Sequence, residues 1–297
     1  MRKTKIVCTI GPACSDEFTL KKMCLAGMNV ARLNFSHGTH EEHLEKINMI
    51  KSVRNSLGLP IAIMLDTKGP EYRIKTFKNQ KITLNDGDKF TFTTADIIGD
   101  ETKVSVSYPN LPKELSVGDT ILLNNGLLTF LVDKIEGANI ECKVLCGGEL
   151  SDRKSMSFPG KVMKQPYLSE QDKKDIKWGV ENSVDYVACS FVSCKQDLID
   201  VRNYMHEIGA EDIELIAKIE NQSGVDNIEE ICEYCDGIMV ARGDMGVEIP
   251  FKMLPAIQKK LIEHLKKYKR GVVGNHCTQK VRSVGKQETV LACVLLL

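Results

Sequence analysis

The sequence predicts an α/β fold, namely an incomplete (β/α)8 barrel of the TIM type that is interrupted by an inserted, small antiparallel β-barrel domain. Two observations lead to this prediction. Short apolar runs alternate with amphipathic helices, which is typical of a parallel sheet covered by helices. Residues 70–163 instead contain short alternating runs separated by Asp-Gly, Gly-Asp and Asn-Gly turns, which indicate antiparallel hairpins.

The barrel strands are expected at six apolar runs. In chain order these are residues 5–10, 30–35, 61–67, 186–191, 214–220 and 237–242. The β domain falls between the third and the fourth of them. The predicted organisation is therefore a first barrel segment over 1–69, the β domain over 70–163 and a second barrel segment over 164–297.

Helices are expected between these strands. Thr39 and Glu42 predict a capping box that begins one helix, and Gly58 predicts its end. Another helix begins near Pro255. A third has its apolar residues at helical spacing, at Leu198, Val201, Met205 and Ile208.

Composition restricts the partners and the compartment. Forty basic and forty acidic residues cancel, and the sequence pI is near 7.0, so neither a nucleic acid nor a membrane is expected as a partner. Eleven scattered cysteines and an N-terminus without a long apolar segment predict reduced thiols in a cytoplasmic protein. The final VLACVLLL is too short to span a bilayer.

The strand ELIAKIE, residues 214–220, carries two charges on one face. Because side chains alternate along a strand, Lys218 and Glu220 point the same way as Ile216. Active sites of such barrels lie at the carboxyl ends of the strands. Lys218 and Glu220 are therefore expected to point into the barrel at its catalytic mouth. The alternative is a buried structural ion pair.

Polar residues lie at or just beyond the same end of the other strands. They are Arg32, Asn34 and Ser36, then Asp66, Thr67 and Arg73, and finally Asp244 beside Gly243. The carboxylates Glu220 and Asp244 suit Mg2+ rather than zinc, and arginines beside a lysine suit a phosphorylated, carboxylate-bearing substrate. This set predicts phosphoryl transfer. Arg32 alone is also compatible with a solvated rim charge, and His37, His40 and His43 are interpreted as solvated helix residues.

Five segments closely resemble the pyruvate kinase family. In the family's order and spacing they are TKIVCTIGPAC, GMNVARLNFSHGTHEEH, IMLDTKGPEYR, LIAKIENQSGV and GIMVARGDMGVEIP. The resemblance covers about residues 1–268 and includes the inserted β domain. It implies a phosphotransferase of glycolysis that moves the phosphoryl group of phosphoenolpyruvate to ADP, giving pyruvate and ATP, with Mg2+ (or Mn2+) and K+.

The resemblance also implies roles for individual residues. Lys218 would neutralise the moving phosphoryl group, Arg32 would contact the phosphate, and Glu220 and Asp244 would hold Mg2+. Gly243 would also bind substrate. The monovalent-cation ligands would be Asn34, Ser36, Asp66 and Thr67. The nucleotide-side cations would be Arg73 and Lys154, and Glu71 matches the form associated with a requirement for K+.

From about residue 269 the sequence departs from the family pattern. CTQK retains one trace, in which Thr278 resembles the threonine near the substrate carboxylate and the proton-delivery step. Without an eighth parallel strand, the sheet is expected to have unpaired edges. The family's tetramer implies a homo-oligomer, although part of that interface belongs to a C-terminal domain that the sequence lacks.

Three interpretations of function stay open. The first is pyruvate kinase. The second is a catalytically incompetent, truncated pyruvate kinase fragment. The third is a Mg2+-dependent barrel lyase of an oxo-acid, which would not need a domain facing ADP.

Overall fold

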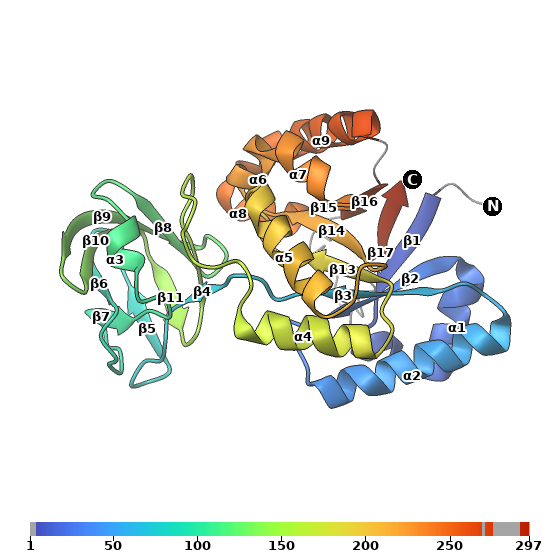
Figure 1. Cartoon of the computed structure of the whole chain (residues 1–297). Helices are drawn as coiled ribbons and strands as arrows, with labels where there is room; N and C mark the ends of the chain where they lie inside the picture. The colour runs from blue at the N-terminus through green and yellow to red at the C-terminus, as the bar shows by residue number, and fades with distance from the viewer. Residues whose placement is uncertain (1–3, 269–270, 276–291, 297) are drawn as a thin grey trace. The chain divides into compact units, whose positions relative to one another are not determined.

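Residues 4–268, 271–275 and 292–296 are described by a computed structural model of the chain (Figure 1). The chain divides into two compact units. The first comprises Met1–Pro70, Pro166–Met245 and Phe251–Leu297, and the second comprises Glu71–Gln165 with Gly246–Pro250. The first unit is an α/β barrel, and the second, called the β unit below, contains most of the antiparallel strands.

Eight strands form a closed barrel in the first unit, in the order β1-β17-β16-β15-β14-β13-β3-β2. Their bounds are β1 (Thr4–Thr9), β2 (Met28–Asn34), β3 (Ala62–Asp66), β13 (Tyr186–Cys189), β14 (Glu214–Ile219), β15 (Gly237–Val240), β16 (Gly271–Asn275) and β17 (Ala292–Leu296). The six strands expected from the sequence are all present, and the predicted α/β barrel with a separate antiparallel sheet is confirmed.

The closure of the barrel differs from the sequence-based expectation of unpaired edges. Strand β17 pairs with β1 on one side and with β16 on the other, and both pairings are antiparallel. The other neighbouring strands of the barrel are parallel. An antiparallel strand satisfies the edge N–H and C=O groups as well as a parallel one does, so the direction of the last strand need not match.

Helices cover the outside of the barrel (Figure 1). Their bounds are α1 (Glu17–Ala26), α2 (His40–Leu57), α4 (Glu170–Glu181), α5 (Lys195–Glu207), α6 (Gln222–Asp226), α7 (Ile228–Tyr234), α8 (Arg242–Glu248) and α9 (Leu254–Tyr268), with the 3-10 turns η1 (Pro12–Cys14) and η2 (Phe251–Met253). Both capping-box hydrogen bonds predicted for α2 are present, between Thr39 and Glu42, and Gly58 ends the helix with a φ of 61°. None of the helices in the described part of the chain is long and apolar enough to cross a membrane.

Two of the hydrophobic clusters found among the described residues belong to the barrel unit. The inner cluster takes one buried side chain from each of six strands, at Val7, Val30, Met64, Ala188, Ile216 and Met239. The outer cluster lies between strands β1–β3 and helices α1 and α2, and includes Leu20, Ile47, Ile50 and Leu65. The inner cluster lies inside the barrel, next to the carboxyl ends of the strands. The polar groups at those ends therefore pack against buried apolar side chains.

The β unit has its own core. Its larger sheet runs β4-β12-β8-β9-β10-β6-β7, and β11 pairs with β5. The bounds are β4 (Tyr72–Arg73), β5 (Lys81–Leu84), β6 (Lys89–Thr93), β7 (Lys103–Ser105), β8 (Thr120–Leu123), β9 (Leu128–Glu136), β10 (Asn139–Cys146), β11 (Gly148–Ser151) and β12 (Ser155–Ser157), with the short helix α3 (Leu111–Glu114). Every pairing is antiparallel except that of β6 with β7. Phe90, Phe92 and Phe130 meet at its centre.

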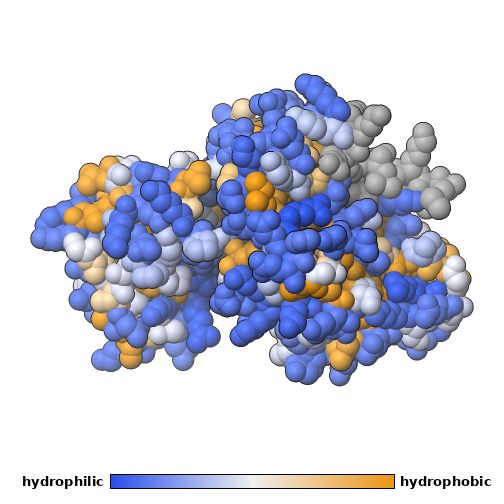
Figure 2. Space-filling view, viewed as in Figure 1, coloured by the Kyte–Doolittle hydropathy of each residue, from blue (hydrophilic) through white to orange (hydrophobic). Residues whose placement is uncertain are grey.

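The visible surface is mixed in polarity. Figure 2 shows hydrophilic residues over most of the face in view, with hydrophobic residues in small separate groups. Scattered apolar residues of this kind are normal on a folded protein.

Candidate active site at the carboxyl ends of the barrel strands

Four neighbouring strands bring charged side chains together at one end of the barrel. Arg32 lies on β2, Asp66 ends β3, Ser190 follows β13, and Lys218 lies on β14. Asp66 is fully buried, and Lys218 is 7% exposed. The backbone register places Asp66 level with Asn34 of β2 and with Ala188 of β13. The sequence-based expectation that these strand ends meet is therefore met for this group.

Lys218 is held by three oxygen atoms. Its Nζ lies 3.0 Å from Asp66 Oδ1 and 3.1 Å from Glu220 Oε1, and it donates to Ser190 Oγ at 2.6 Å. An ammonium group has three N–H donors, so each can face one of these acceptors. Burial alone would lower the pKa of Lys218, but Asp66 and Glu220 outweigh it and raise the pKa. Lys218 is thus a permanent buried cation at neutral pH.

Arg32 completes the cationic side of the cluster. Its Nε donates to Asp66 Oδ2 at 2.6 Å and its Nη1 donates to Thr9 Oγ1 at 3.1 Å. The Arg32 side chain is 11% exposed, so the interpretation as a solvated rim charge is wrong. Burial would raise the pKa of Asp66, yet the charges of Lys218 and Arg32 hold this pKa below its ordinary value. Asp66 is therefore ionised and bridges the two cations.

Of the two buried carboxylates of this cluster, Glu220 has the weaker compensation of its charge, because it pairs with Lys218 whereas Asp66 pairs with both Lys218 and Arg32. It is 2% exposed, and its Oε2 accepts the Phe191 N–H at 2.7 Å. Burial raises the pKa of Glu220 to about 7; Lys218 opposes the shift, while Asp244 and Asp66 add to it. Asp244 lies in α8, directly after β15, and is exposed. The buried ion pair of Lys218 with Glu220 exists, but as one part of a larger charged cluster.

The donor set fits a hard divalent cation. Asp66 and Glu220 both pair with Lys218, and Asp66 and the exposed Asp244 both raise the pKa of Glu220. A divalent ion between Glu220 and Asp244 would relieve that repulsion, and oxygen ligands are those that Mg2+ prefers. No three His, Cys, Asp or Glu side chains converge as a metal site within the described residues. Further ligands would have to come from substrate and water.

The oxygen atoms expected to hold a monovalent cation lie beside the same cluster. Asn34 ends β2 and its Oδ1 accepts the Ser36 N–H at 3.0 Å, while Ser36 is exposed. Thr67 is buried directly after β3, and its hydroxyl accepts the Ser190 N–H at 3.1 Å. Together with Asp66 these residues supply carboxylate, amide and hydroxyl oxygens. The set suits a hard cation, although Asp66 is engaged by Lys218 and Arg32.

Sequence reasoning missed Ser190. It is 2% exposed, and its hydroxyl contacts Lys218, the Thr67 carbonyl at 2.7 Å and Asp66 Oδ1 at 3.2 Å. Serine is common in loops, so its type carried no signal. Its place did: it lies at the carboxyl end of a predicted apolar strand, as Asp66 and Glu220 do.

The residues expected to bind the nucleotide, Arg73 and Lys154, lie in the β unit. Arg73 is in β4 and donates through Nε to Glu71 Oε2 at 2.9 Å and through Nη1 to the Arg153 carbonyl at 2.6 Å. Lys154 precedes β12, and its carbonyl accepts the Ile74 N–H at 3.0 Å. Gly243 is in α8 with Asp244. Thr278 lies outside the described residues.

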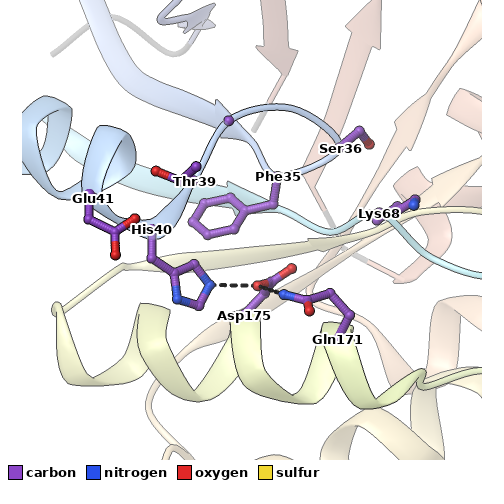
Figure 3. A pocket seen from close by; sticks show the side chains of 9 residues that line it. Phe35, Ser36, Thr39, His40, Glu41, Lys68, Gln171 and Asp175 are labelled. Carbon is purple, nitrogen blue, oxygen red and sulfur yellow. Dashed lines mark hydrogen bonds and ion pairs between the residues drawn. The ribbon is translucent and has the colours of Figure 1, made fainter.

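A pocket of about 370 Å³, whose lining includes Ser36, lies between the start of α2 and helix α4 (Figure 3). His40 Nε2 lies 2.6 Å from Asp175 Oδ1, which also accepts Gln171 Nε2 at 2.7 Å. His43 is only 2% exposed and stacks on Phe35 with ring centroids 4.0 Å apart. The interpretation of these histidines as solvated is therefore wrong for His43, and His40 is half-buried.

Comparison with known proteins identifies the family. The model of the family described as "Pyruvate kinase, barrel domain" matches residues 1–289, which extends beyond the departure expected near residue 269. A pyruvate kinase of Clostridium perfringens is 47% identical over 264 residues, covering 89% of this chain and 56% of the relative. One of Staphylococcus haemolyticus is 46% identical over 276 residues, covering 92% and 47%.

Solved structures agree. The crystal structure of a pyruvate kinase from Cryptosporidium parvum superimposes with a TM-score of 0.88 at 37% identity, covering 92% of this chain and 57% of that one. The chain spans about half the length of the curated relatives it matches. On this evidence the chain belongs to the pyruvate kinase family.

Proposed function

We propose that this chain carries a pyruvate kinase reaction centre and transfers a phosphoryl group from phosphoenolpyruvate to ADP. One observation carries the proposal: Arg32, Asp66, Lys218 and Glu220 form a single buried cluster at the carboxyl end of the barrel strands. Catalytic groups of such barrels lie at this end. Phosphoryl transfer needs chiefly positioning and compensation of charge, which fixed cations supply.

In this proposal the bond between phosphorus and the enol oxygen breaks as a new bond forms from phosphorus to the terminal phosphate oxygen of ADP. The enolate that remains takes a proton at its methylene carbon to give pyruvate. Lys218 neutralises the charge on the transferred group, and Arg32 orients the phosphate. Gly243 contributes backbone to the substrate site. Thr278 is proposed for the substrate carboxylate and the delivery of the proton.

Cations complete the proposed site. Glu220 and Asp244 would hold Mg2+ or Mn2+, which compensates negative charge on substrate oxygens when bound. Asn34, Ser36, Asp66 and Thr67 would hold K+. Arg73 and Lys154 are proposed to bind the nucleotide, and the β unit to exclude water as a lid. We propose the cytoplasm as the compartment, on the cysteine pattern and the family.

The test is turnover of phosphoenolpyruvate and ADP by the purified chain with Mg2+, with and without K+. Lys218→Ala should abolish pyruvate formation, whereas Lys134→Ala, a control on an exposed lysine that pairs with Glu136, should not. Absence of turnover by folded protein would overturn the proposal and leave the incompetent-fragment interpretation. Decarboxylation of oxaloacetate measured in the same samples distinguishes the lyase.

A further inference from the structure

Two chain connections between the barrel and the β unit meet at one residue of the site. The β unit begins at Glu71 and the main segment ends at Gln165, so Gly69 and Tyr167 lie just on the barrel side of each connection. Tyr167 Oη donates to the Ser190 carbonyl at 2.6 Å. A Cβ placed on Gly69 would lie 2.7 Å from the same carbonyl oxygen. Both connections therefore contact the backbone of Ser190.

The contacts are specific and buried. Tyr167 is 5% exposed, and burial raises the pKa of its hydroxyl well above the ordinary value, so the hydroxyl remains a donor. Gly69 has a φ of 72°, which side-chain-bearing residues rarely adopt, and its N–H donates to the buried Asp172 at 3.1 Å. The Gly69 contact is close enough to exclude any larger residue.

The side chain of Ser190 connects this backbone to Lys218. The hydroxyl accepts from Lys218 Nζ at 2.6 Å, and two acceptors lie within reach of its one proton, the Thr67 carbonyl at 2.7 Å and Asp66 Oδ1 at 3.2 Å. The other two partners of Lys218 are carboxylates, Asp66 at the end of β3 and Glu220 two residues beyond Lys218 along the chain. Ser190 is the neutral partner, and its backbone carbonyl is approached by the chain on either side of the β unit.

We propose that Tyr167 and Ser190 form a positioning link, in which the Tyr167 hydroxyl fixes the Ser190 backbone and the Ser190 hydroxyl fixes the ammonium of Lys218. The inference rests on the proposed function, because its role is to hold Lys218 where the phosphoryl group passes. Ser190 and Tyr167 are positioning residues rather than catalytic ones. They act through Lys218 and make it depend on the chain that returns from the β unit.

The test compares Tyr167→Phe and Ser190→Ala with Tyr204→Phe in the full chain. Tyr204 is a matched control, because its hydroxyl also donates to a backbone carbonyl, that of Lys173, at 2.9 Å, but away from the site. Loss of one positioning hydrogen bond should lower kcat about tenfold in Tyr167→Phe, and by more in Ser190→Ala, with KM for phosphoenolpyruvate within about twofold. Tyr204→Phe should change neither constant.

A second readout keeps the link separate from the proposed function. The side-chain 15N resonance of Lys218, assigned by its loss in Lys218→Ala, should shift in Tyr167→Phe and in Ser190→Ala but stay in place in Tyr204→Phe. If the wild-type chain is inactive, the proposed function fails and the resonance alone decides the link. An unmoved resonance in Tyr167→Phe, or a kcat equal to that of Tyr204→Phe, overturns the link.

Discussion

The pKa of Glu220 predicts how stability and Mg2+ binding depend on pH. Burial and the neighbouring carboxylates raise this pKa from 4.5 to about 7, against the opposing charge of Lys218. The folded state therefore holds the Glu220 proton more tightly than the unfolded state does. The contribution of Glu220 to the stability of the folded chain is therefore greatest below pH 4.5 and is lost as the pH rises toward 7.

The magnitude follows from the two values. A difference of about 2.5 pKa units corresponds to roughly 3 kcal/mol that the ionised carboxylate costs the folded chain at neutral pH. In the proposed site Mg2+ would bind the ionised form of Glu220, so the affinity for Mg2+ should fall about tenfold for each pH unit below 7. Bound Mg2+ should recover part of the lost stability, and more so at pH 8 than at pH 5.

Urea unfolding at pH 5, 6, 7 and 8, with EDTA or with Mg2+, measures both effects. Glu220→Gln keeps the shape of the side chain and removes its titration, so the difference between wild type and variant isolates this one group. The difference is needed because buried His43, whose pKa burial lowers, contributes in the opposite direction: stability from it is lost as the pH falls. Parallel pH profiles for the two proteins, with equal Mg2+ effects, would refute the reasoning.

Two other substitutions test the framework of the site. Gly69→Ala forces a side chain into a φ of 72° and against the Ser190 carbonyl, so it should cost about 2 kcal/mol or more in urea unfolding, whereas Gly58→Ala, at φ 61° with open space, should cost only about 1 kcal/mol. Equal losses would contradict the close approach. Asp66→Asn leaves two buried cations without their shared partner and should destabilise by about 3–5 kcal/mol, while Glu17→Gln, in an exposed pair with Lys21, should cost less than about 1 kcal/mol. A small effect at Asp66 in the same unfolding assay would mean that water or ions already compensate the cluster.

The barrel was predictable where periodicity and end signals agree. The helix α2 has a capping box at its start, a glycine at its end and an apolar stripe between them, and its observed bounds match that pattern. Strand β14, which begins at Glu214, was equally clear from its apolar run. Lys218 and Glu220, two charges on one face of that run, pointed either to a functional site or to a buried ion pair. Local chemistry fixes such elements almost independently of the rest of the fold.

Long-range pairing was harder to predict. The run ACVLL at residues 292–296 is apolar and could be assigned to a strand, but nothing within it specifies an antiparallel partner. His43 was misjudged for a similar reason: helix position predicted exposure, while stacking on Phe35, a residue of the preceding loop, buries it. Ser190 was missed because serine is not a distinctive residue type at a strand end, and its role depends on its contacts with Lys218, Thr67 and Asp66.

The charged cluster depends on register more than on residue type. Asp66 lies level with Asn34 and with Ala188, Ala188 lies level with Ile216, and Lys218 stands two residues beyond Ile216 on the same face. Because the side-chain period of a strand is two, a slip of one residue in β14 would turn Lys218 away from the barrel interior and leave Asp66 bound to one cation. Ile216, the β14 residue of the inner cluster, would leave that cluster in the same slip, so its burial at 3% exposure opposes the slip. The apolar packing of the barrel interior and the register of β14 therefore both favour the face on which Lys218 lies beside Asp66.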